Sequence, residues 1–143
     1  MKRVPWFLER RRELAARYDE ALAGVEWLRT PTVPEGYVHS YQSYVCFFAP
    51  EEPRLANVDE LHRLRNRLMA FLQERGIATR QGTHAAVLQD VYARKYGLRP
   101  EHFPNAYFAD RLTLALPLYP QLTDAEHDTV VDALTRGWQA IAA

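Results

Sequence analysis

Lysine is scarce in this sequence of 143 residues, where only Lys2 and Lys95 occur. A lysine that forms a Schiff base must be desolvated or supported by a specialised site. Lys2 stands at the terminus, and Lys95 follows an arginine in the polar stretch "ARKYG". The sequence therefore contains no candidate for Schiff-base chemistry.

Disulfides, an excess of one charge and long apolar runs are also missing. The one cysteine, Cys46, fits a reducing cytoplasm, and in the run "VCFF" we expect it to be a buried apolar side chain. Eighteen basic residues balance eighteen acidic ones, whereas nucleic-acid binders usually carry a basic excess. No stretch approaches the roughly 20 apolar residues of a membrane span, and the N-terminus lacks the apolar core of a secretory signal. We expect a cytoplasmic protein without a nucleic-acid or membrane partner.

Several catalytic motifs are absent as well. A hydrolase using Ser40 or Ser43 would need a GxSxG elbow, and there is none. The five histidines form neither HExxH nor a Cys/His zinc spacing, which argues against a metal site. The glycine-rich phosphate loop of a doubly wound parallel sheet is also missing.

The residue pattern predicts alternating helices and strands. We expect helices at 5–23, 58–75 and 84–96, a helical turn at 105–110, and a last helix after Thr123, with strands at 37–48, 77–81 and 111–116. This order favours an α+β domain: a small, mainly antiparallel sheet of three to four strands with helices packed on one face. A parallel doubly wound sheet is the alternative. No linker divides the chain, so we expect a single domain over residues 1–143.

Local signals add finer expectations. Asn57 with Glu60 and Thr123 with Glu126 each match the capping box. In the helix expected at 84–96, the spacing of the apolar residues predicts an inward face made of Val87, Leu88, Val91, Tyr92 and Tyr96. The run "ERRRE" predicts a solvated face of paired charges. His62 and His127 are expected at the surface.

Two histidines are candidates for a site. His39 and His84 each fall at the end of an expected strand among other polar groups. If those strands were neighbours, both imidazoles could face one site. The alternative is that each histidine has only a structural role.

Several stretches resemble one family when taken together and in order. They are "FLERRRELAARYDEAL", "HSYQSYVC", "LRNRLMAFLQERGIATRQGTHA" and "LTLALPLYPQLTDAEHDTVVDAL". This set resembles the C-terminal part of the DegT/DnrJ/StrS sugar aminotransferases, which are pyridoxal-phosphate enzymes of fold type I. The resemblance covers nearly the whole chain and makes residues 5–23 the helix that connects the large and small domains.

The resemblance also implies a role for individual residues. The stretch "RQGTHA" matches a loop that faces the cleft between the two domains, so His84, flanked by Arg80 and Thr83, is expected to bind substrate. His39 and Gln42 match the start of the family's polar strand, and the resemblance implies that they, like Arg80 and Thr83, also contact the substrate. Many members carry a second histidine shortly after the first, whereas this chain continues with residues 85–88, "AAVL".

The part of the family that binds the cofactor lies N-terminal to the stretches matched here. It carries the lysine, the acidic partner of the pyridine nitrogen and the phosphate cup. The resemblance therefore implies that this chain alone binds no pyridoxal 5'-phosphate. The partners it implies are the missing large domain or an adjacent subunit, a second copy in a homodimer, and a nucleotide-sugar substrate.

The sequence is compatible with three functions. The chain could be one part of an aminotransferase that acts on a keto nucleotide-sugar. It could instead be a non-catalytic interaction or sugar-binding module that uses Trp6, Phe7 or Trp27 as an exposed apolar surface. It could also be a remnant without function.

Overall fold

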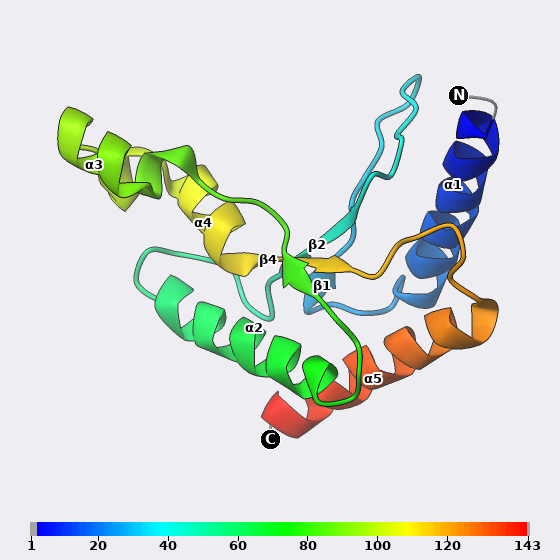
Figure 1. The fold of residues 1–143 in the computed structure, drawn as a ribbon. Helices are drawn as coiled ribbons and strands as arrows, with labels where there is room; N and C mark the ends of the chain where they lie inside the picture. Colours follow the sequence, from blue (N-terminus) through cyan, green and yellow to red (C-terminus); the bar gives the residue numbers. More distant parts are fainter. Residues whose placement is uncertain (1–2, 143) are drawn as a thin grey trace.

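The computed structural model describes residues 3–142, and Lys2 therefore lies outside the described part. The elements are α1 (Val4–Ala21), β1 (Leu28–Arg29), β2 (Tyr44–Phe48), α2 (Val58–Gln73), β3 (Arg80–Gln81), η1 (Ala86–Leu88), α3 (Asp90–Tyr96), η2 (Pro100–His102), α4 (Pro104–Leu112), β4 (Thr113–Leu116) and α5 (Asp124–Ala142). The strands form one antiparallel sheet in the order β1-β2-β4-β3 (Figure 1). The expected α+β class is confirmed. No helix within residues 3–142 is long and apolar enough to cross a membrane.

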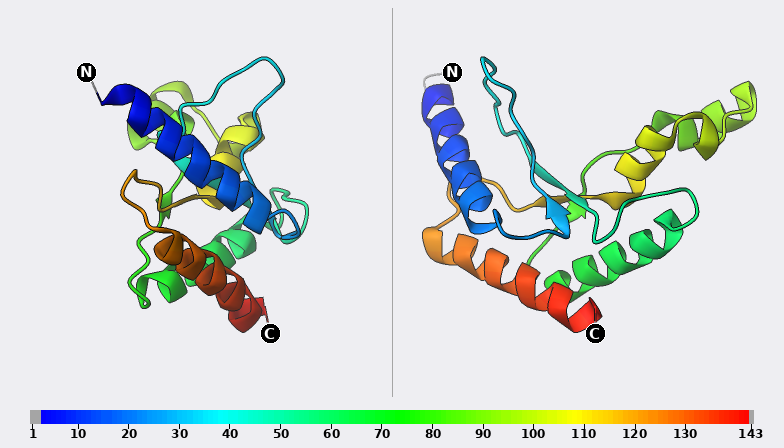
Figure 2. Two further views of the ribbon diagram at one scale, coloured as in Figure 1. Left: turned by 90° about the vertical axis from the view of Figure 1, so that its right-hand side faces the viewer. Right: turned by 180° about the vertical axis from the view of Figure 1, so that it is seen from behind.

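The main core lies between the sheet and the helices α1, α2 and α5. Tyr44, Cys46 and Phe48 alternate along β2 toward these helices and are fully buried. Leu114 and Leu116 of β4 join them. Figures 1 and 2 show the same arrangement, with α1, α2 and α5 gathered on one side of the sheet. Helices therefore cover one face of the sheet, as expected.

A second, smaller core joins the start of α2 to α4. Its buried members are Val58, Leu61, Tyr107 and Leu112. Leu112 lies in the segment 111–116 that was expected to form a strand. It instead ends α4, which is longer than the single turn that the sequence predicted.

The strand expected over residues 37–48 is only half formed. Residues 44–48 pair in the sheet, whereas residues 37–43 form an extended loop. The carbonyls of Tyr41 and Gln42 accept hydrogen bonds from Arg11 Nη1 at 2.9 and 2.8 Å, and Tyr41 has a left-handed φ of 47°, which lies outside the range of a strand. Two residues of the missed strand β1, Leu28 and Arg29, pair with the other edge of β2.

The helix expected over residues 84–96 is broken. Gln89 has an extended conformation, with ψ 131°, and separates the short turn η1 from α3. The expected inward face is wrong for α3, because Val91, Tyr92 and Tyr96 are all exposed. Gly97 ends α3 in the left-handed region at φ 61°, which agrees with the expected helix end at residue 96.

One of the two capping boxes forms. Glu126 Oε2 accepts from the backbone N–H and the hydroxyl of Thr123, both at 2.8 Å, and Thr123 Oγ1 accepts from the Glu126 N–H. Asn57 instead turns back, and its Oδ1 accepts from the Arg54 N–H at 2.7 Å. The predicted box at Asn57 is therefore wrong, because its side chain closes the preceding loop.

Candidate functional site

The face of the sheet that lies opposite the main core is the first candidate surface. Arg80, Ala115 and Val45 lie side by side across β3, β4 and β2 and point to this open face. Gly82 follows β3 and donates to the Thr113 carbonyl at 3.4 Å. A Cβ on Gly82 would overlap the Val45 side chain and lie 2.9 Å from Thr113 Cβ. Because Gly82 has no side chain, the segment after β3 can lie against the sheet beside the exposed Arg80.

The loop after β3 is organised by Gln81. Its side-chain nitrogen donates to the Thr83 carbonyl at 2.8 Å and lies 3.1 Å from His84 Nδ1. With Nδ1 accepting, a neutral His84 carries its proton on Nε2. Both Thr83 and His84 are exposed. The structure thus places Arg80, Thr83 and His84 on one short exposed segment at the edge of the sheet, with Gln81 holding the imidazole.

The loop before β2 contains the other two predicted residues, His39 and Gln42, and it is held by α1. Arg12 Nε donates to the His39 carbonyl at 3.2 Å, and His39 Nδ1 accepts the Tyr41 N–H at 2.8 Å. Tyr41 occupies the left-handed region at φ 47°, a conformation that costs a non-glycine residue about 1–3 kcal/mol. These contacts hold the loop in a defined conformation, with His39 and Gln42 exposed to solvent.

The structure does not bring His39 and His84 together within one chain. Strand β4 lies between β2 and β3, so the two strands are not neighbours. Because both pair antiparallel to β4, they run in the same direction. His39 precedes the start of β2 and His84 follows the end of β3, which places them at opposite ends of the sheet. The condition for a shared imidazole site is therefore not met within this chain.

The arginines of α1 do more than form a solvated face. Arg10 pairs with Glu13 at 3.0 Å, as expected, but it also donates to the Leu122 carbonyl at 3.0 Å. Arg11 donates to the Leu118 carbonyl at 3.2 Å in addition to the carbonyls of the loop before β2. Helix α1 therefore holds two connections of the sheet in place.

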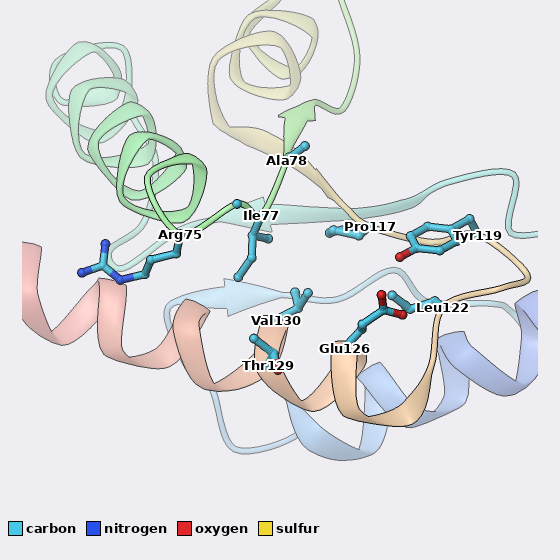
Figure 3. Close-up of a pocket in the computed structure, with 10 residues that line it drawn as sticks. Arg75, Ile77, Ala78, Pro117, Tyr119, Leu122, Glu126, Thr129 and Val130 are labelled. Atoms are coloured by element: carbon cyan, nitrogen blue, oxygen red, sulfur yellow. The ribbon is translucent and has the colours of Figure 1, made fainter.

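A cavity of about 450 Å³ lies where β3 and β4 separate. Pro117 has no N–H, so the ladder that pairs Arg80 with Ala115 does not continue toward Ala78. Figure 3 shows the lining, which is mainly apolar: Arg75, Gly76, Ile77, Ala78, Pro117, Tyr119, Leu122, Glu126, Thr129 and Val130. This cavity contains none of the five residues that the resemblance implies, and its one carboxylate caps α5.

Buried titratable groups lie in the main core. Burial raises the pKa of Cys46 to about 12, so the thiol stays neutral, in agreement with an apolar role. Burial, together with a hydrogen bond to Asp19, raises the pKa of Tyr44. His127, expected at the surface, is buried, with its ring centroid 4.0 Å from that of Tyr18. Its two ring nitrogens have no hydrogen-bond partner among the described residues, and burial lowers its pKa.

Of the other groups expected at the surface, His62 and Trp27 are partly buried and Trp6 is exposed. His62 is half-buried, and its Nδ1 lies 2.8 Å from the Arg111 carbonyl. Trp27 stacks on Trp138 with ring centroids 5.2 Å apart, so it belongs to the core, whereas Trp6 is exposed.

The described residues do not fit the covalent attachment of pyridoxal phosphate. Lys95 is the one lysine among residues 3–142, and it is exposed on α3 with its ammonium 5.3 Å from the Tyr96 ring centroid. Within the same residues, no three His, Cys, Asp or Glu side chains lie close enough to hold a metal ion.

Comparison with known proteins gives sequence and structural relatives. A dTDP-4-dehydro-2,3,6-trideoxy-D-glucose 4-aminotransferase of Saccharopolyspora spinosa is 35% identical over 133 residues, which are 92% of this chain and 30% of that protein. The crystal structure of the aminotransferase TlmJ from Streptoalloteichus hindustanus superposes with a TM-score of 0.78 at 31% identity, over 98% of this chain and 34% of that one.

A more distant structure shares the fold. The PLP form of a proposed sugar aminotransferase from Streptococcus pneumoniae has a TM-score of 0.82 at 23% identity, covering 98% of this chain and 33% of that one. In all three comparisons this chain spans about a third of the relative's length. The sequence model of the DegT/DnrJ/EryC1/StrS aminotransferase family matches residues 1–135. The chain therefore belongs to the DegT/DnrJ/EryC1/StrS aminotransferase family and corresponds to about a third of a full-length member.

Proposed function

We propose that this chain forms the C-terminal, substrate-facing part of a pyridoxal-phosphate-dependent aminotransferase that acts on a keto group of a nucleotide-linked sugar. The observation that carries the proposal is the family match over residues 1–135. The Saccharopolyspora spinosa relative, which is named for a dTDP-linked keto sugar, supports the substrate class. Such a reaction moves an amino group from an amino acid to the sugar during amino-sugar or polysaccharide biosynthesis.

The chain's own role in this reaction is to bind and orient the substrate. The exposed Arg80 guanidinium on the open face suits a phosphate oxygen of a nucleotide, because arginine pairs well with phosphate. His84 can donate from Nε2 to a sugar hydroxyl, because Gln81 lies against its Nδ1. Thr83 would extend this contact surface. His39 and Gln42, at the other end of the sheet, would reach a site that includes further protein.

The cofactor requires the part of the enzyme that this chain does not supply. Pyridoxal phosphate stabilises negative charge on the carbon from which the amino group is transferred. Lys95 is exposed at the tip of α3, so it is a poor candidate for holding that group. We therefore expect the isolated chain to be inactive. The working enzyme would add a large domain, within the same polypeptide or as an adjacent subunit, and would form a homodimer in the cytoplasm.

A full-length chimera tests the proposal. In this protein, the present chain replaces the matched 133-residue segment of the Saccharopolyspora spinosa aminotransferase. We expect the chimera to bind the cofactor and to form the amino sugar, while the isolated chain forms none. A folded, cofactor-loaded chimera that transfers no amino group would contradict the proposal. In that case, binding of a dTDP-sugar by the isolated chain would favour the alternative of a non-catalytic sugar-binding module.

A further inference from the structure

An apolar stripe on α3 is left uncovered by the rest of the described chain. Val91, Tyr92 and Tyr96 are 71%, 49% and 59% exposed. The two tyrosine rings stack on each other, with centroids 6.4 Å apart and an angle of 11° between their planes. We call these three residues the α3 stripe. Contiguous exposed apolar patches of this kind commonly mark interaction sites.

The sequence of this segment has the pattern of a buried helix. The spacing of the stripe residues predicts an inward-facing surface, yet the structure gives that surface nothing to face. None of the residues in η1, α3 or η2 is buried, although all three elements lie within the described part of the chain. A seven-residue helix is marginal in water without packing against another element. The segment therefore has the features of an element stabilised by a partner.

The α3 stripe lies away from the main core, so a partner would contact the chain at the stripe and not at the core. Figures 1 and 2 show α3 at the tip of an arm that extends beyond α4 and stands away from α1, α2 and α5. The base of the arm is anchored to the second core by Tyr107 and by a 2.8 Å hydrogen bond from the Ala85 N–H to Asp110. The tip is therefore held in a defined place while its apolar side remains open.

A second copy of this chain is a poor occupant for the α3 stripe. A stable interface buries roughly 1,200–2,000 Å² in total. Three side chains from each copy, two of them already half covered, would bury well below that range. The family relatives supply a larger partner, because this chain spans only about a third of their length.

We propose that the α3 stripe docks against the cofactor domain that full-length relatives contain in addition to the region matched here. This inference rests on the proposed function and names the surface through which the two parts meet. Aromatic side chains are well suited to such a contact, because each contributes a large apolar area with few rotatable bonds. Docking would also hold the loop that carries His84, since that loop leads directly into the arm.

Hydrogen exchange on the isolated chain is the first test. We expect the amides of α3 to exchange at rates close to those of an unstructured peptide, while those of α2 and α5 are protected. Slow exchange of α3 in the monomeric isolated chain would overturn the proposal, because the arm would then need no partner. Protection that rises with the concentration of the chain alone would also overturn it, in favour of a second copy.

The chimera provides the second test. We expect α3 amides to be protected at least tenfold more in the chimera than in the isolated chain. The double substitution Val91→Asp/Tyr96→Asp should abolish that gain, whereas Tyr119→Asp, at a similarly exposed residue away from the arm, should leave it unchanged. An active chimera whose α3 amides remain unprotected would overturn the docking surface and leave the proposed function intact. A chimera with protected α3 but no amino transfer would reject the function and support the docking surface.

Discussion

Arg11 Nη1 donates to the carbonyl oxygen of Gln42 at 2.8 Å and so links the first helix to the loop that enters the central strand. The same nitrogen also lies within hydrogen-bonding distance of the Tyr41 and Leu118 carbonyls. One guanidinium thereby holds the loop before β2 and the connection after β4. The position of Gln42, a predicted substrate residue, depends on a side chain 31 residues earlier in the sequence.

Replacing Arg11 by methionine should loosen both connections. Hydrogen bonds from a charged group contribute about 1.5–3 kcal/mol each. We therefore expect the free energy of unfolding to fall by about 1–3 kcal/mol, as measured by urea denaturation. The control is Arg67→Met, at an exposed position for which the described residues provide no hydrogen bond or ion pair. Equal stability of the two variants would show that Arg11 does not hold the loops.

A methyl group at position 82 should destabilise the edge of the sheet. In Gly82→Ala the new Cβ would overlap the Val45 side chain, and overpacking of this kind typically costs about 1–3 kcal/mol. The matched control is Gly24→Ala, because nothing lies within 4 Å of a Cβ built there. Val45→Ala should recover part of the loss when combined with Gly82→Ala. Additive losses in the double variant would argue against a direct clash.

Burial of His127 should make stability depend on pH. The folded chain holds the His127 pKa below its ordinary value of 6.5, mainly through burial. As the pH falls below that value, the unfolded chain binds a proton that the folded chain resists, so the free energy of unfolding decreases until the folded pKa is passed. The charged and titratable groups that face this ring are Arg17, Tyr18 and Glu20 of α1 and Asp124 and Asp128 of α5.

Urea denaturation at pH 8 and at pH 5 measures this effect. We expect His127→Leu to reduce the loss of stability between the two pH values, because the leucine cannot bind a proton. His102→Asn, which alters an exposed histidine, should leave the loss unchanged. The explanation would be wrong if His127→Leu retained the full pH dependence of the original chain.

His84 should affect turnover in the active chimera without affecting cofactor binding. We expect His84→Ala to lower kcat/KM by about 10- to 100-fold, the range of one or two lost hydrogen bonds to a bound substrate. The absorbance of the bound cofactor should not change, because the proposed contact is with the substrate. His102→Ala is the matched control. Unchanged kcat/KM in His84→Ala would leave His84 with a structural role only.

The α3 stripe is a case in which the sequence and the structure give different information. The spacing of Val91, Tyr92 and Tyr96 predicts a helix, which forms, and a buried face, which does not. The same spacing cannot say whether the burying element belongs to this chain, and the structure shows that none of the described elements covers it. The predicted inward face was wrong for this chain, because periodicity is a property of one segment alone and does not show what packs against it.

Local chemistry was sufficient where a feature depends on residues close in sequence. The Thr123–Glu126 cap and the end of the helix at Tyr96 were evident from the sequence, since each involves neighbours within a few residues. Tertiary structure alone decided that β4 separates β2 from β3, that Arg11 binds the carbonyls of residues 41–42, and that His127 is buried. Each of these depends on contacts between residues distant in the sequence, and local periodicity carries no information about such contacts.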